Sequence, residues 1–348
     1  MELVRRTGYD EDHATFRDSV RRFVAAEVTP DLDRWRAAGR FDRGLFANAG
    51  EQGFLGTSVP EELGGAGVDD PRFPVVLVEE LARSGAAGLA LVVARQLGVV
   101  LPMLAALAEW SDDVAAALTA LAAGESVGCV VVLSSGSTSA RAVPGAAVAD
   151  LFVVVDADGA VVVLPRESVG VDVTCSLLGG SDAAVADVTV APHLLDTTSP
   201  VEPAGLAARS LDLWSAVVGL AAAQAAFELT GDYVQERAVF GKPLSSFENT
   251  RFRLAENGAE LVAAHQLLDS AVAALADGDL ADALAAATRI VVERVHDQVV
   301  DQGMQLHGGY GYMREYPISH AFGDARFVRA TAAAVSEPRR VLADALGL

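Results

Sequence analysis

Lysine is almost absent from this 348-residue sequence and occurs once, at Lys242. Lysine and arginine together number 26 against 47 aspartates and glutamates, so the formal net charge is −21 at pH 7. A surface with this excess of carboxylates repels nucleic acid and anionic membranes, and we expect neither as a partner. A polyanionic small molecule would also be repelled at long range, so its binding would depend on local arginines.

Cysteine is scarce as well, with only Cys129 and Cys175 in the chain. Two cysteines give neither a disulfide framework nor the spacing of a metal site, so we expect no bound metal. Both are expected to be buried small hydrophobic residues in a reducing cytoplasm. The first twelve residues contain no apolar run, so the sequence predicts no signal peptide and a cytoplasmic location.

No long hydrophobic run is free of polar residues or proline. The most apolar stretch, residues 85–110, is interrupted by Arg95, Gln96 and Pro102. It therefore predicts a pair of core helices and not a membrane span. Aromatic residues make up 6% of the chain and hydrophobic residues 51%, with alanine and valine dominant, a composition that suits tightly packed helices.

The hydrophobic period changes twice along the chain. Residues 1–123 show apolar residues at helical spacing and predict an N-terminal all-helical domain. Residues 124–197 contain short β-branched runs and predict a small β-domain. From residue 198 to residue 348 the helical period returns and predicts a C-terminal helical bundle. The expected fold is mainly α with a small central β-domain.

Local signals refine this layout. Asp156-Ala-Asp-Gly159 separates two β-branched runs and predicts a hairpin turn. Ser245 with Glu248 fits a capping box at the start of the second long bundle helix. Pro338 is expected to kink or break the last helix. The predicted strands cover residues 129–133, 151–155, 160–164, 169–173 and 185–190.

Two motifs about seventy residues apart could hold a diphosphate. Residues 236–244 read Glu-Arg-Ala-Val-Phe-Gly-Lys-Pro-Leu and join two long helical patterns. Residues 305–312 read Gln-Leu-His-Gly-Gly-Tyr-Gly-Tyr and end a third helix with a glycine-rich turn. An arginine at a helix end and a turn with free backbone amides are two ways to bind phosphate groups.

With Glu315-Tyr-Pro317 and Asp324-Ala-Arg326, these motifs resemble the C-terminal half of the acyl-CoA dehydrogenases. The N-terminal half resembles the same family at residues 17–23 (Arg-Asp-Ser-Val-Arg-Arg-Phe), 53–56 (Gly-Phe-Leu-Gly), 59–67 (Val-Pro-Glu-Glu-Leu-Gly-Gly-Ala-Gly) and 79–83 (Glu-Glu-Leu-Ala-Arg). The resemblance covers nearly the whole chain. It implies a helical, β and helical order of domains, an acyl-CoA substrate, and FAD bound across a subunit interface.

The resemblance also assigns cofactor contacts. Arg237 and Phe240 match the residues that reach the flavin of a neighbouring subunit, and Gln305, Gly308 and Gly309 match the turn that closes on the adenosine-diphosphate end. Without the motif, Arg237 would read as a solvated charge at a helix end. His307 is expected to be a packed turn residue, and Phe247 and Phe252 are expected to lie in the core. The usual electron acceptor of the family is an electron-transfer flavoprotein.

The catalytic base of the family is missing from its expected place. Active members carry a glutamate in the last helix, after Asp-Ala-Arg, and that position here is Ala332, or Ala333 if one residue is inserted. Glu337 lies a turn or more beyond it. Some relatives place the glutamate on the first bundle helix, where this chain has Asp212, a residue that more often caps a helix or interacts with its dipole.

A flavin-lining loop of the β-domain is also lost. The family's Thr-Glu-Pro and Gly-Ser-Asp segments are replaced by residues 134–141, which read Ser-Ser-Gly-Ser-Thr-Ser-Ala-Arg, and residues 134–138 predict a surface loop. Residues used in a chain's own active site are gone, whereas those lent to a neighbour's flavin survive. We therefore expect the non-catalytic subunit of a heteromeric acyl-CoA dehydrogenase, paired with a homologous catalytic subunit. Two alternatives remain: a homo-oligomer with Asp212 or Glu337 as a relocated base, and a non-catalytic assembly scaffold.

Overall fold

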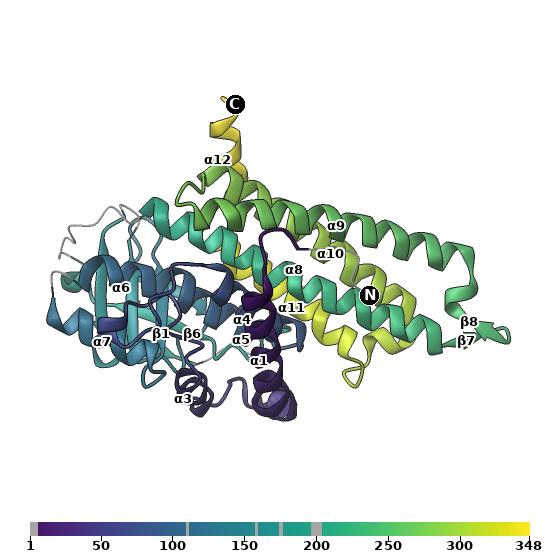
Figure 1. Cartoon of the computed structure of the whole chain (residues 1–348), viewed down its shortest axis with the longest axis horizontal. Coiled ribbons are helices and arrows are strands. Elements are labelled where there is room, and N and C mark those ends of the chain that lie inside the picture. The colour runs from purple at the N-terminus through teal and green to yellow at the C-terminus, as the bar shows by residue number, and fades with distance from the viewer. Residues whose placement is uncertain (1–5, 109–110, 157–158, 174–176, 196–203) are drawn as a thin grey trace.

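The computed structural model describes residues 6–108, 111–156, 159–173, 177–195 and 204–348. Helices of the N-terminal region and the small sheets lie at one end of the molecule, and long bundle helices extend to the other end (Figure 1). The fold class expected from the sequence, mainly α with a small central β-domain, is confirmed. Cys175 and part of the predicted Asp156–Gly159 turn fall outside the described residues, whereas Cys129 is buried and unpaired.

The N-terminal region is helical throughout. Asp10 caps its first helix by accepting hydrogen bonds from the backbone amides of Asp12 and His13. The helices are α1 (Glu11–Glu27), α2 (Leu32–Ala38), α3 (Gly44–Glu51), α4 (Arg72–Arg83), α5 (Ala87–Arg95), α6 (Leu101–Leu107) and α7 (Asp112–Ala122). A π-helical turn, η3 (Gln96–Val100), joins α5 to α6.

The most apolar stretch is part of the core. Residues from Ala87 to Leu107 form a helical segment long and apolar enough to cross a membrane, but 83% of its apolar window is buried inside the protein. The same holds for Ala207–Glu236 of the bundle. In both segments, other helices of the fold cover the apolar surface that a lipid bilayer would otherwise cover.

Two charged motifs of the N-terminal half pair with each other. The guanidinium of Arg17 lies 2.7 Å from Glu79 and 2.5 Å from Glu80, and Arg21 lies 3.0 Å from Glu80. Both glutamates are buried on α4, so each needs a cationic partner. The network therefore holds α1 against α4. It gives the motifs at residues 17–23 and 79–83 a shared structural role.

The middle region contains two three-stranded sheets. In the first, β1 (Gly128–Val132) pairs in parallel with β3 (Leu151–Val155), which pairs antiparallel with β4 (Val161–Pro165). In the second, β6 (Ala186–Val190) lies between β2 (Ser139–Val143) and β5 (Val169–Asp172). Strand β2 was not predicted from the sequence; it begins at Ser139, directly after the expected surface loop, and is held by its pairing with β6.

The C-terminal region is a bundle of α8 (Ala204–Glu236), α9 (Glu248–Ala276), α10 (Asp282–His307) and α11 (Pro317–Ala333). The predicted capping box is wrong, since Ser245 lies in the 3₁₀ turn η7 (Leu244–Ser246) and the start of α9 has no side-chain cap. The predicted core position of Phe252 is also wrong: its side chain is 59% exposed.

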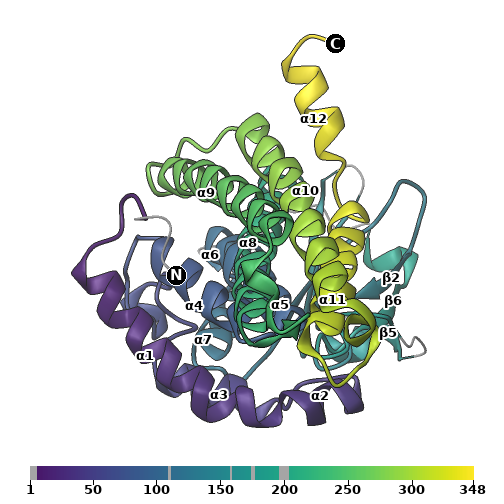
Figure 2. The same cartoon turned by 90° about the vertical axis from the view of Figure 1, so that its right-hand side faces the viewer.

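The last helix is broken near Pro338, as the sequence predicts. A short helix, α12 (Pro338–Ala345), follows α11 and points away from the rest of the molecule (Figure 2). At the opposite end of the bundle, a small hairpin of β7 (Ala238–Val239) and β8 (Lys242–Pro243) extends beyond the ends of the long helices (Figure 1).

Candidate functional site

The two diphosphate motifs meet at the distal end of the bundle. Arg237 directly follows α8, and its backbone oxygen accepts a 2.7 Å hydrogen bond from the amide of Leu244. The second motif forms the end of α10 and a 3₁₀ turn, η8 (Gly308–Tyr312). The guanidinium of Arg237 lies over the ring of Tyr310, 5.3 Å from its centroid. This contact joins motifs that are far apart in the sequence.

Aromatic packing holds η8 in place beneath Arg237. The rings of Tyr310 and Tyr316 stack with centroids 4.8 Å apart, and those of Tyr233 and His307 stack at 3.9 Å. His307 is buried, and its Nδ1 lies 2.8 Å from the carbonyl oxygen of Gly303. The prediction that His307 is a packed turn residue is confirmed.

The surface of this end is open and rich in hydrogen-bond donors. Gln305 is exposed, and a Cβ added to Gly308 or Gly309 would meet no atom within 4 Å. Gly308 has φ = 60° and ψ = −134°, a backbone conformation that favours glycine. Phe240, at the hairpin tip, has φ = 53° and is 92% exposed. An exposed aromatic residue in a strained backbone position is typical of a binding surface.

These residues fit the diphosphate and ring of the expected FAD. Arg237 is exposed and makes no ion pair with any described residue, so its guanidinium donors are available for an anion. The turn at Gly308 and Gly309 presents backbone next to that cation without side chains in the way. The structure thus brings Arg237, Gln305, Gly308 and Gly309 to one surface, with Phe240 beside them on the hairpin.

The expected base position lies elsewhere, near the other end of α8. Ala332 is 1% exposed near the end of α11, and it offers only a methyl group. The preceding carbonyl, that of Thr331, accepts a 3.1 Å hydrogen bond from the guanidinium of Arg95. A cation of α5 therefore lies next to the place where active members carry a carboxylate.

Asp212 is part of a buried ion pair. Its Oδ1 lies 2.8 Å from the Arg289 guanidinium and accepts a 2.6 Å hydrogen bond from the hydroxyl of Ser336. Arg289 also binds Glu293 at 2.7 Å. The Asp212 carboxylate is thus enclosed by partners that fix its position, an arrangement typical of a structural group.

Glu337 caps a helix and faces solvent. Its carboxylate accepts a 3.2 Å hydrogen bond from the amide of Arg339, at the start of α12. Its side chain is 51% exposed, which leaves it in contact with water. A base must act in a dry site against a bound substrate, so this location does not favour a catalytic role.

Sequence reasoning missed how the space near Ala332 is filled. Arg95 and Gln96 are both buried, and Arg95 Nε and Gln96 Nε2 have no hydrogen-bond partner among the described residues. Burial lowers the pKa of Arg95 to about 10, although nearby Cys129 opposes this shift. Trp214 packs directly on the π-helical turn: a Cβ added to Gly98 would lie 1.9 Å from its indole nitrogen. The only signal in the sequence was the polar interruption at Arg95 and Gln96.

The loop after β1 does not form the family's flavin-lining segment. Ser134, Ser135 and Gly136 are exposed, and Ser137 exchanges hydrogen bonds with the backbone of Ser139 at 2.8 and 3.2 Å. The loop therefore satisfies its own polar groups. Among the described residues, no cluster of three or more histidine, cysteine, aspartate or glutamate side chains could hold a metal ion.

Comparison with protein families gives two matches on this chain. The model of the acyl-CoA dehydrogenase N-terminal domain matches residues 10–139. The model of the acyl-CoA dehydrogenase C-terminal domain matches residues 213–332. Together they cover well over half of the sequence, and the second match includes both Arg237 and Ala332.

Curated proteins and solved structures agree with these models. Rat mitochondrial long-chain specific acyl-CoA dehydrogenase is 25% identical over 91% of this chain and 82% of its own length. Acyl-CoA dehydrogenase IpdE2 of Mycobacterium tuberculosis is 29% identical over 95% of each chain. The acyl-CoA dehydrogenase structure from Geobacillus kaustophilus has the same fold, with a TM-score of 0.89, 23% identity and coverage of 99% and 100%. The chain belongs to the acyl-CoA dehydrogenase family, whose members are FAD-dependent oxidoreductases.

Proposed function

We propose that this chain is the subunit of a heteromeric acyl-CoA dehydrogenase that lacks the catalytic base. A homologous partner subunit carries the glutamate and most of the flavin site, and this chain completes that site from the distal end of its bundle. The observation that carries the proposal is the contrast between two places on the fold. Ala332 is buried and offers no base, whereas Arg237 is exposed without an ion-pair partner among the described residues, and a Cβ added to Gly308 or Gly309 would meet no atom within 4 Å.

Each contributed residue has a defined role in the complex. Arg237 neutralises the FAD diphosphate, and Tyr310 beneath it limits the positions that the guanidinium can take. Gly308 and Gly309 let backbone approach the adenosine-diphosphate end closely, and Gln305 adds polar contacts there. Phe240 covers part of the flavin and excludes water. When bound, FAD would supply the hydride acceptor for the β-carbon of an acyl-CoA, and the partner's glutamate would be the base for the α-proton.

The net charge of this chain supports separate roles for the two subunits. The net charge of −21 opposes the approach of a CoA ester to this chain, so substrate binding suits a partner with its own cationic groups. Electrons then leave to an electron-transfer flavoprotein, and the assembly works in the cytoplasm. The buried pair of Asp212 with Arg289 and the capping role of Glu337 count against a relocated base.

Co-expression tests this proposal. The chain alone should be colourless and inactive, and co-expression with the homologous reading frame beside its gene should give a yellow complex that reduces an artificial acceptor with acyl-CoA. Arg237→Ala should lower the affinity of that complex for flavin roughly 10- to 100-fold, because a charge-assisted contact is lost. Arg294→Ala is the control, since Arg294 is an exposed arginine paired with Glu260.

Two outcomes would overturn the proposal. A yellow protein made of this chain alone that oxidises acyl-CoA would support the homo-oligomer, and Asp212→Asn would then show whether Asp212 is its base. A complex that forms without flavin and is unaffected by Arg237→Ala would support the assembly scaffold.

A further inference from the structure

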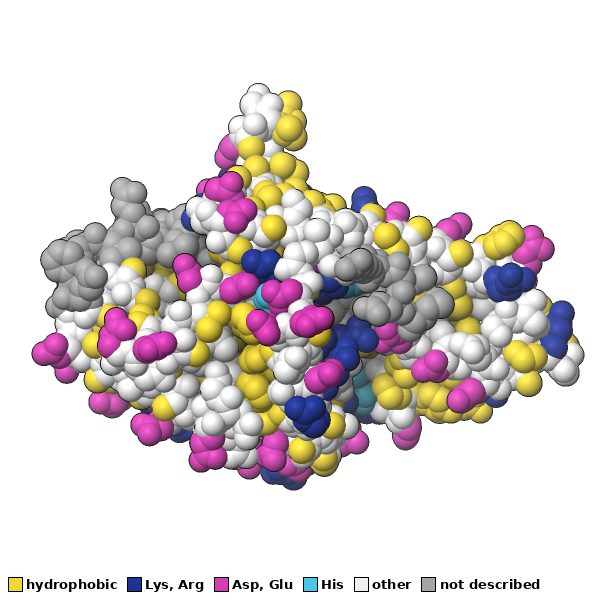
Figure 3. Space-filling model, in the orientation of Figure 1, with side chains coloured by type: hydrophobic (Ala, Val, Ile, Leu, Met, Phe, Trp, Pro, Cys, Tyr) yellow, Lys and Arg dark blue, Asp and Glu magenta, His cyan; other side chains and the backbone are white. Residues whose placement is uncertain are grey.

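A cleft of about 530 Å³ opens between α1, α4, α8 and α9, away from both places described above. Figure 3 shows dark blue arginine side chains gathered in a hollow of a surface that is otherwise dotted with acidic groups. Its volume falls within the range of small-molecule sites. Residues of four helices and of the segment before α1 line it, so it depends on the tertiary fold and not on one helix face.

The floor of the cleft is apolar. Leu220 and Ala221 come from the middle of α8, and Leu261 and Val262 come from the facing turn of α9. Val262 is half-buried, and the other three are buried beneath the cleft. A hydrocarbon chain lying on this floor would be removed from water, which favours binding in proportion to the apolar area covered.

The polar wall has a surplus of hydrogen-bond donors. Both oxygens of Glu79 are occupied, one by Arg6 at 2.6 Å and the other by Arg17 at 2.7 Å. Both oxygens of Glu228 are occupied too, by Arg83 at 2.7 Å and by Gln224 at 3.0 Å. These two carboxylates of the wall are therefore used within the protein.

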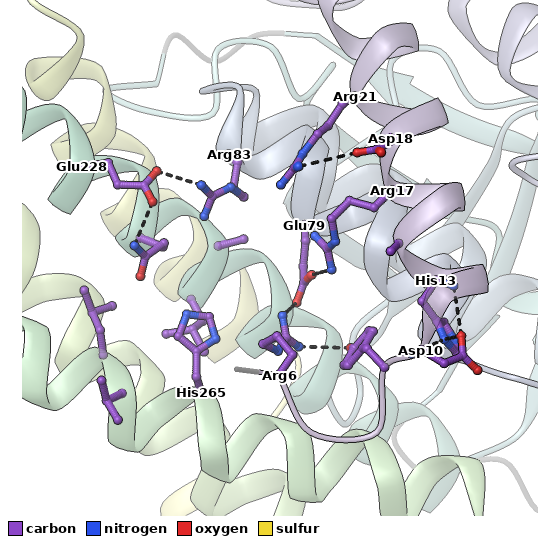
Figure 4. Close-up of a pocket in the computed structure, with 17 residues that line it drawn as sticks. Arg6, Asp10, His13, Arg17, Asp18, Arg21, Glu79, Arg83, Glu228 and His265 are labelled. Atoms are coloured by element: carbon purple, nitrogen blue, oxygen red, sulfur yellow. Dashed lines mark hydrogen bonds and ion pairs between the residues drawn. The ribbon is translucent and has the colours of Figure 1, made fainter. Parts of the chain in front are cut away.

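The arginines keep free donors after these bonds. Among the described residues, Arg83 bonds only through Nη2, although a guanidinium carries five N–H donors. Arg21 uses Nε for Glu80, and its Nη1 lies 3.8 Å from Asp18. Arg21 and Arg83 approach the space from α1 and α4 (Figure 4). The two further acids, Asp10 and Asp18, lie at the rim with side chains 68% and 67% exposed.

His265 adds an unpaired polar atom from the α9 side. Its Nδ1 is buried without a hydrogen-bond partner among the described residues, and the ring faces the arginines (Figure 4). Burial, together with the positive charge of Arg6, lowers the pKa of His265 to about 4, so the ring is neutral at pH 7.

We propose that this cleft is a binding site for an anionic amphiphile, with its carboxylate or phosphate head on Arg21, Arg83 and His265 and its hydrocarbon tail on the apolar floor. An anion supplies the acceptors that the wall lacks, and the tail covers the floor. The site lies beside the middle of α8, between the degenerate base position and the flavin-binding end. It does not depend on how the flavin is shared between subunits.

Calorimetric titration of the purified full chain, in the assembly that it forms, tests the site. Decanoate and decyl phosphate are the anionic probes, and decanol is the neutral probe with the same tail. We expect saturable binding of at least one anion at one site per chain, with decanol at least about tenfold weaker. Binding of only one anion identifies the head group. Equal binding of decanol, or no saturable binding of either anion, would overturn the proposal.

Variants locate the binding. Arg83→Gln should weaken anion binding by at least about tenfold, whereas Arg294→Gln, an exposed arginine outside the cleft, should leave it unchanged. Val262→Trp should fill the floor and abolish binding. If that variant fails to fold, the His265 imidazole resonance of the wild-type chain serves instead. It should shift on addition of the bound anion, and binding without such a shift contradicts this location.

Discussion

Asp212 and Arg289 form an ion pair with 2.8 Å between carboxylate and guanidinium, and both side chains are at least 97% buried. The pair joins α8 to α10. Ser336, which follows α11, donates a hydrogen bond to the same carboxylate oxygen. Three segments of the bundle therefore meet at one carboxylate, so removing this carboxylate should lower the stability of the protein.

Asp212→Ala should lower the free energy of unfolding by about 3–5 kcal/mol, because it leaves the buried Arg289 with Glu293 as its only carboxylate partner. Urea denaturation of the purified protein measures the change. Asp232→Ala is the control, since Asp232 is an exposed aspartate of the same helix and should change stability by less than about 0.5 kcal/mol. A stable Asp212→Ala variant whose complex has lost turnover would contradict the structural role.

Gly98→Ala should destabilise the protein by about 1–3 kcal/mol, because the new methyl group would lie 1.9 Å from the Trp214 indole nitrogen. Thermal unfolding and the fluorescence of Trp214 report the displacement of the ring. Gly231→Ala is a matched control on α8, where an added Cβ meets nothing within 4 Å and alanine should stabilise the helix. Equal effects of the two substitutions would show that Trp214 does not pack on Gly98.

Glu79→Gln should cost about 3–5 kcal/mol of unfolding free energy, because the variant leaves the Arg6 and Arg17 guanidiniums without their shared charge. Despite its burial, these arginines hold the pKa of Glu79 near 2, below its ordinary value of 4.5. Its stabilising effect is therefore complete above pH 4.5 and is lost as the pH falls towards 2. Denaturation of Glu79→Gln and the exposed control Glu51→Gln at pH 7 measures the cost, and equal stability would refute it.

Asp324 should make the protein less stable as the pH rises from about 4 to 7. Burial, and then the negative charge of Asp182, raises its pKa to about 7, whereas Arg36 acts in the opposite direction. An acid whose pKa is raised by folding stabilises below its unfolded pKa, and that effect is lost through the folded pKa. The slope for one proton is at most about 1.4 kcal/mol per pH unit.

Asp324→Asn isolates this contribution, because asparagine keeps an oxygen for the 2.7 Å hydrogen bond from the Gly180 amide. The buried His265 and His296 have lowered pKa values and give the opposite slope below about pH 6.5, so only the difference between variant and wild type is informative. Urea denaturation from pH 5 to 8 should show the variant gaining stability relative to wild type as the pH rises. A difference independent of pH would exclude a raised pKa at Asp324.

The fold followed from the sequence wherever periodicity was strong. The change from helical to β-branched runs located the central sheets, and Pro338 marked the break between α11 and α12. Strand β2 was missed because Ser139–Val143 lacks a strand pattern and is held by its partner β6. Ser245 and Glu248 had the spacing of a capping box, but the turn η7 placed the serine outside the helix start.

The candidate site was predictable only as separate motifs. The sequence singled out Arg237 and the Gly308–Gly309 turn, but their meeting through Tyr310 depends on how α8 and α10 end side by side. The roles of Arg237, Phe240, Gln305 and the two glycines towards FAD stay predictions. The bond from Arg95 to the Thr331 carbonyl beside Ala332, and the packing of Trp214 on Gly98, could not be foreseen, because they depend on the tertiary fold and on a π-helical turn that no local pattern announces.

Helix α8 is continuous from Ala204 to Glu236, so Asp212 and Arg237 are attached to a single rod and lie roughly 37 Å apart along its axis. Inserting one residue between them would rotate the hairpin about the rod by about 100° and swing Arg237 off Tyr310. Point substitutions at the end of α8 that carries Asp212 leave that angle unchanged. Substitutions could therefore remove catalytic groups near the Asp212 end of α8 while Arg237 at the other end kept its orientation, provided that the length of the helix did not change.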